Sequence, residues 1–131
     1  MNGETKETIE NTKRFLKETK PDNIVPAQSL PHPNTPLWDW VEENGTWLKP
    51  PFHTLFAHDK NYALPEPCFE TREFSKEDRM KALRELFSLK IATYPFYRLP
   101  FAIALYNKDN GFRHWQDSFM MVKDWVEWRL R

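Results

Sequence analysis

The sequence predicts an all-α fold, in which a small irregular helical domain of about 3–5 helices follows an extended, proline-rich N-terminal segment. Two observations carry this expectation. Apolar residues recur with a helical period in the second half of the chain, and eleven prolines stand against three glycines. The 131 residues are enough for one domain and a tail. We expect an N-terminal helix and arm over residues 1–36 and the helical domain over residues 37–131.

Composition excludes several classes of protein. Nineteen basic and nineteen acidic residues give a net charge of zero, which argues against nucleic acid as a partner because such binding needs surplus cations. A single cysteine excludes a disulfide scaffold. The most apolar stretch, 91–106, is interrupted by Pro95 and Pro100 and is shorter than the roughly 20 residues of a transmembrane helix. The first twenty residues resemble neither a secretory signal nor a cleaved presequence, so we expect an intracellular protein.

The N-terminal third predicts two helices joined by an extended segment. Residues 4–19 favour a helix with few apolar positions, which either docks through a small patch or frays. Five prolines within residues 21–36 indicate an extended path over a surface, with a disordered linker as the alternative. Thr35 and Pro36 are typical of a helix start, and Gly45 is expected to end that helix in a left-handed conformation. Residues 52–74 have no sustained period, and we expect coil with one short strand-like or single-turn piece near residues 55–57.

The next helix has clear start and stop signals. Ser75 and Asp78 resemble a capping box, and Pro95 ends the helical pattern, which predicts a helix over residues 76–94. Its apolar stripe comprises Met80, Leu83, Phe87, Ile91 and Tyr94. Residues 100–106 predict a short helix that is apolar all round and should therefore be buried, and residues 107–111 predict a loop.

The last helix is expected over residues 112–130, and its apolar residues form two groups. The first group spans an arc of about 80° and should form the core with the 76–94 helix; it comprises Phe112, Trp115, Phe119, Val122 and Val126. The second group lies about 130° away and comprises Met121, Trp125 and Trp128. We expect this second arc to contact another subunit or a membrane edge. The alternative is that the N-terminal segments of the same chain cover it.

Candidate chemical residues are few. His53 and His58 are five residues apart, a spacing that points two imidazoles away from each other on a helix or a strand, so Asp59 beside them adds only a weak metal signal. Cys68 lies between Glu66 and Glu70, whose charges disfavour a thiolate, and we expect a structural thiol. The sequence contains no catalytic fingerprint or glycine-rich phosphate loop, and we assign no catalytic, cofactor-binding or metal-ligating residue.

These patterns favour a non-catalytic accessory or structural subunit that wraps on and stabilises a larger protein assembly. The expected partners are other protein subunits, with a membrane edge as an additional contact. The candidate interface residues are Met121, Trp125, Trp128, Phe15 and Trp38. The type of protein suggests an organellar complex, peripheral to the inner mitochondrial membrane and without a cleaved presequence. The alternative is a soluble helical binding module or a small enzyme with an aromatic-lined pocket.

Overall fold

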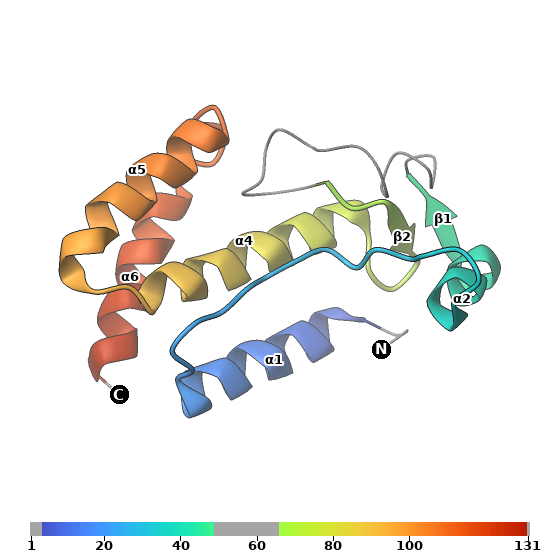
Figure 1. Ribbon diagram of the computed structural model, residues 1–131, viewed down its shortest axis with the longest axis horizontal. Coiled ribbons are helices and arrows are strands. Elements are labelled where there is room, and N and C mark those ends of the chain that lie inside the picture. Colours follow the sequence, from blue (N-terminus) through green and yellow to red (C-terminus); the bar gives the residue numbers. More distant parts are fainter. Residues whose placement is uncertain (1–3, 49–65, 131) are drawn as a thin grey trace.

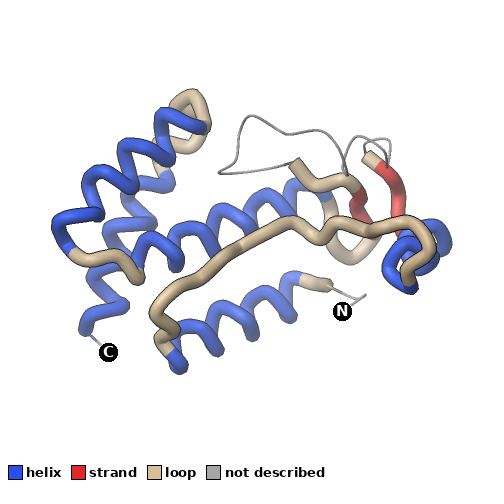
Figure 2. The backbone as a smooth tube through the Cα atoms, viewed as in Figure 1, coloured by secondary structure: helices blue, strands red, loops and turns tan. Residues whose placement is uncertain are grey.

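Helices make up most of the computed structural model, which describes residues 4–48 and 66–130 (Figures 1 and 2). In chain order the elements are α1 (Lys6–Thr19), α2 (Pro36–Asn44), β1 (Gly45–Trp47), β2 (Phe69–Thr71), α4 (Lys76–Ala92), the 3₁₀ turn η1 (Phe96–Arg98), α5 (Leu99–Asp109) and α6 (Asp117–Leu130). The predicted, mostly helical fold is confirmed, and the small sheet is an addition to it. The short piece expected near residues 55–57 lies outside the described residues, as do His53, His58 and Asp59.

The long helix α4 runs through the middle of the molecule (Figure 1). Its N-terminus carries the predicted capping box: the Ser75 side chain accepts a hydrogen bond from the Asp78 amide, and the Asp78 carboxylate accepts one from the Ser75 amide, both at 3.2 Å. The helix ends at Ala92, two residues before the predicted end at 94. There the Thr93 and Tyr94 amides bond the carbonyls three residues earlier, which tightens the last turn.

The main core lies where α5 and α6 pack against the C-terminal half of α4 (Figure 1). Its buried residues are Leu83, Ile91, Leu99, Tyr106 and Met121. Met80, Phe87, Tyr94, Ala102, Ile103 and Trp125 surround them and are partly buried. The predicted stripe of the 76–94 helix therefore does face the core. This helix also packs against the last helix, but through Met121 and Trp125 and not through the predicted stripe of that helix.

A second, smaller core joins α2 to the two-stranded sheet at the other end of α4 (Figure 1). Strands β1 and β2 are antiparallel, with Gly45 opposite Thr71. Gly45 does not adopt the predicted left-handed conformation: its φ is −115°, because the chain continues directly from α2 into β1. A Cβ at Gly45 would lie 3.1 Å from the Glu70 carbonyl oxygen and 3.2 Å from the Val41 side chain. The glycine thus serves close packing rather than a left-handed helix end.

Helix α1 lies along α4 and buries none of its residues (Figure 1). Ion pairs hold it there: Glu4 contacts Arg79 at 3.0 Å, and Lys13 contacts Glu85 at 2.8 Å. Residues 20–35 then run back beside α4 to α2 without helix or strand (Figure 2). Within that segment, Ile24 is buried.

Helix α6 begins at Asp117, five residues later than predicted. The predicted start at residue 112 is wrong because Gly111 and Phe112 both have a φ of 59°, in the left-handed region. Two successive left-handed residues reverse the chain after α5, and residues 111–116 form turns that lead into α6. The prediction that the short helix of residues 100–106 is buried on all sides is also wrong. In α5, Phe101 is 78% exposed and Leu105 is 57% exposed.

Candidate interaction surface

The side of α6 that faces away from α4 exposes a continuous row of large apolar residues. We call this row the outer stripe; it comprises Trp115, Phe119, Val122, Val126 and Leu130. These side chains are between 43% and 80% exposed. Within the helix, their positions span an arc of about 80°. The rings of Trp115 and Phe119 meet edge to face with their centroids 6.3 Å apart, so the turn before α6 extends the stripe.

Polar contacts determine which side of α6 faces α4. Arg84 on α4 donates two hydrogen bonds to the Asp117 carboxylate, at 2.8 and 2.6 Å. One turn further along α4, the buried Ser88 hydroxyl donates to Asp124 at 2.6 Å. Asp117 and Asp124 are seven residues apart and therefore lie on one face of α6. If α6 were rotated so that the outer stripe faced α4, the hydrogen bonds between Arg84 and Asp117 would be lost.

The Asp117 carboxylate is the centre of this network. It is 5% exposed and also accepts a hydrogen bond from the Tyr106 hydroxyl at 2.5 Å. Burial raises the pKa of Asp117, but the hydrogen bonds from Arg84 and Tyr106 outweigh burial and hold this pKa below its usual value of 3.8. Burial and the contact with Asp117 raise the pKa of Tyr106, so its hydroxyl stays protonated and remains a donor.

The lowered pKa of Asp117 predicts how stability depends on acid. A carboxyl whose pKa is lower in the folded state contributes stability above its unfolded pKa, and this contribution is lost as the pH falls through the folded pKa. We therefore expect Asp117→Asn to be less stable than the native chain at neutral pH. The difference in free energy of unfolding should shrink as the pH falls below about 3.8. Urea unfolding at a series of pH values measures this difference.

Asp109→Asn is the matched control, because Asp109 is exposed at the end of α5. This variant should follow the native chain at every pH. A difference between native chain and Asp117→Asn that is the same at neutral and acidic pH would contradict the role given to the Asp117 carboxylate.

The structure reverses the roles predicted for the two arcs of the last helix. Met121, predicted at an interface, is 0% exposed and belongs to the main core. Trp125 packs against that core, and its indole nitrogen donates to the Tyr94 carbonyl at 2.8 Å. Phe112, Trp115, Phe119 and Val126, predicted in the core, are exposed. The prediction that the last helix has two apolar sides was correct. The side predicted to form the core is exposed, and the side predicted to form an interface packs within the chain.

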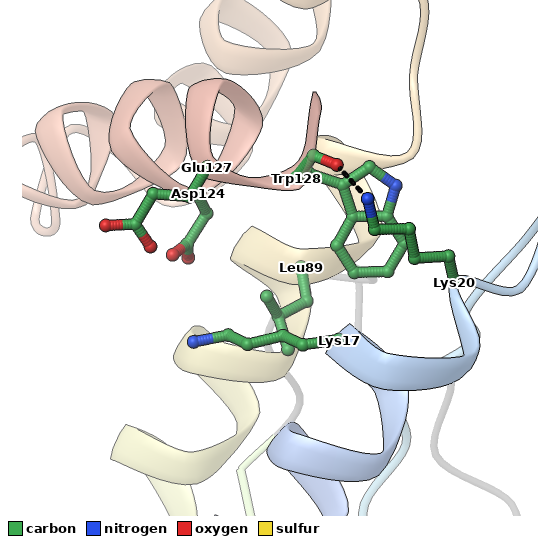
Figure 3. A pocket seen from close by; sticks show the side chains of 6 residues that line it. All are labelled: Lys17, Lys20, Leu89, Asp124, Glu127 and Trp128. Atoms are coloured by element: carbon green, nitrogen blue, oxygen red, sulfur yellow. Dashed lines mark hydrogen bonds between the residues drawn. The ribbon is translucent and has the colours of Figure 1, made fainter. Parts of the chain in front are cut away.

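Trp128, the third residue of the predicted interface arc, lies at the meeting point of α1, α4 and α6. Figure 3 shows it at a small cavity that is lined by Lys17, Lys20, Leu89, Asp124, Glu127 and Trp128. The Lys20 ammonium donates a hydrogen bond to the Trp128 carbonyl at 2.7 Å. At about 10 Å³ the cavity holds one water at most and is too small for a ligand. It lies where α1 and α6, from the two ends of the chain, meet on α4.

The two remaining interface candidates differ in their surroundings. Phe15 on α1 is 61% exposed and lies on a different helix from the outer stripe. Trp38 on α2 is partly buried, and its ring lies 4.8 Å from that of Trp47. Trp47 in turn donates from its indole nitrogen to Glu42 at 2.9 Å. Trp38 is therefore partly engaged within its own chain.

Of the cysteine and histidines named above as candidate chemical residues, the structure describes Cys68, whereas His53 and His58 lie outside the described residues. Cys68 is 2% exposed, and its thiol donates to the Ser29 carbonyl at 3.5 Å, a position suited to a structural thiol. Within residues 4–48 and 66–130, no three His, Cys, Asp or Glu side chains are grouped so that they could hold a metal ion.

Two further findings bear on the class of protein. Every helix in the described part of the chain is too short or too polar to cross a lipid bilayer. Comparison with protein-family models, with curated proteins and with solved structures found no match for this chain.

Proposed function

We propose that this protein is a non-catalytic accessory subunit, which binds a larger protein assembly through the outer stripe and stabilises that assembly. One observation carries the proposal. Five large apolar side chains, each at least 43% exposed, line the side of α6 opposite the core and the turn before that helix. Contiguous apolar patches on a folded surface mark sites of interaction, because their exposure to water is unfavourable.

The surroundings of the outer stripe suit a protein partner. Trp115 and Phe119 supply the aromatic anchors that dominate binding at protein interfaces. Charges of both signs lie beside the outer stripe, since Lys123 and Glu127 form an ion pair at 3.9 Å on the neighbouring side of α6. An apolar centre with a mixed polar rim is the usual anatomy of such an interface.

The proline-rich segment extends the proposal to a second contact. Val25 is 75% exposed and Leu30 is 39% exposed on this segment. Prolines keep such a chain stiff, which lowers the entropy lost when it binds along a partner. We include the proline-rich segment, with its exposed Val25 and Leu30, as a second contact with the partner and as the wrapping part of the proposed subunit.

The experiment compares native, tagged chain with two variants in cells that lack the endogenous protein. Phe119→Gln with Val126→Gln removes two apolar side chains of the outer stripe and keeps a good helix former at each position. Phe15→Gln is the matched control, with an exposed phenylalanine on another helix. Native gels and cross-linking report the fraction of the chain that is held in a larger assembly.

We expect the native chain and Phe15→Gln to migrate with a stoichiometric assembly whose abundance falls when the chain is absent. The double variant should reduce the bound fraction at least about tenfold, because interface anchors each contribute on the order of 2 kcal/mol. A chain that migrates as a monomer of 15.8 kDa, with no effect on any assembly, would overturn the proposal and favour the soluble binding module or small enzyme.

A further inference from the structure

A second exposed apolar face lies on η1 and α5 and differs from the outer stripe in its charge. Its large side chains are Phe96, Tyr97, Phe101 and Leu105, which are 57% to 78% exposed. The opposite side of α5 packs into the main core through Leu99, Ile103 and Tyr106. The face is therefore presented by a helix that is already folded and anchored.

The charges around this face are mainly positive. Arg98 and Lys108 are both exposed, at the start and near the end of α5. From residue 86 to residue 108 the chain contains no aspartate and no glutamate. The nearest acidic residues in sequence are Glu85, which pairs with Lys13 of α1, and Asp109 at the helix end. Cations that flank exposed aromatic and aliphatic side chains complement an anionic, partly apolar surface.

We propose that this face of η1 and α5 binds the surface of an anionic phospholipid bilayer. Helices that lie in the bilayer interface combine a face of aromatic and aliphatic residues with flanking lysine and arginine, which attract anionic headgroups. With eleven residues, α5 lies on such a surface and does not span it. This inference is independent of the protein partner proposed for the outer stripe, because it uses different residues on a different helix.

The position of the aromatic residues supports a bilayer over a second protein. Phe96, Tyr97 and Arg98 are consecutive and all exposed, in the 3₁₀ turn that begins this face. Aromatic rings beside a guanidinium group are favoured at the headgroup level, where apolar and charged environments meet. A protein partner would require acidic groups of its own to match Arg98 and Lys108, whereas an anionic leaflet supplies negative charge at every position.

The test is flotation of the full chain with phosphatidylcholine vesicles and with mixed phosphatidylcholine–phosphatidylserine vesicles. Phe101→Gln with Leu105→Gln removes apolar contact, and Arg98→Gln with Lys108→Gln removes the cations. Phe119→Gln with Val126→Gln is the matched control, since it changes two exposed apolar residues of the outer stripe. All altered side chains are exposed, and circular dichroism melts confirm that each variant is folded.

We expect the native chain and the control to bind mixed vesicles, and to bind pure phosphatidylcholine vesicles roughly thirtyfold more weakly. The Phe101/Leu105 variant should bind mixed vesicles on the order of a hundredfold more weakly, because two buried apolar side chains are lost. The Arg98/Lys108 variant should bind both vesicle types alike. Absence of binding to mixed vesicles, equal binding of the native chain to both types, or loss of binding only in the outer-stripe variant would each overturn the proposal. None of these outcomes changes the native-gel result for the outer stripe, so the two proposals fail separately.

Discussion

Met121→Ala is expected to lower the free energy of unfolding by about 3 kcal/mol, within the range for methionine-to-alanine changes in cores. Met121 is 0% exposed and packs with Leu83, Ile91 and Tyr106 in the main core. Truncation removes its contacts with residues from both α4 and α5 and leaves a cavity that the surrounding helices fill only in part. Urea unfolding followed by circular dichroism measures the loss.

Val122→Ala is the matched control for this prediction. Val122 is the next residue in the chain, but it lies on the outer stripe and is 46% exposed. Its replacement should change the free energy of unfolding by no more than about 0.5 kcal/mol, as is usual for surface positions. Equal losses for Met121→Ala and Val122→Ala would contradict the orientation of α6 and, with it, the outer stripe as a free surface.

Asp117→Ala is expected to destabilise the chain by about 3 kcal/mol, the lower end of the range for breaking one side of a buried ion pair. The change leaves the partly exposed Arg84 guanidinium without its carboxylate. It also leaves the buried Tyr106 hydroxyl without the acceptor that it contacts at 2.5 Å. A buried donor that loses its partner keeps the full cost of its desolvation.

Asp109→Ala provides the comparison for Asp117→Ala, because it removes an exposed carboxylate at the C-terminus of α5. We expect a change near zero, since an acidic group at a helix C-terminus is slightly unfavourable in any case. If Asp117→Ala were as stable as Asp109→Ala, the polar contacts between α4 and α6 would not explain the rotation of α6.

Local signals in the sequence determined where several elements begin and end. The Ser75 and Asp78 capping box predicted the start of α4, and Thr35 with Pro36 predicted the start of α2, as the structure has them. These features act within one helical turn, because a side chain there bonds an amide only three residues away. Because these signals do not depend on distant parts of the chain, the starts of both helices could be predicted from the sequence.

The apolar pattern of the last helix could be predicted, but its assignment could not. The periodicity of the sequence shows that α6 has two apolar sides. It does not show which of them is buried, because a valine contributes equally to the pattern in the core and at the surface. The choice between the sides depended on Arg84 and Ser88 of α4, which are 33 and 36 residues away from their partners Asp117 and Asp124. The spacing of these two aspartates beside Met121 was a readable signal, and it became informative only together with the donors on α4.

Tertiary structure alone decided which surface is free for partners. The exposure of Phe119 and Phe101 follows from how α5 and α6 pack on α4. The physical reason is that apolar burial is non-directional and fits either side of α6, whereas buried carboxylates require particular donors. The hydrogen bonds of Asp117 and Asp124 with α4 therefore determine which side of α6 is buried, and the outer stripe stays exposed.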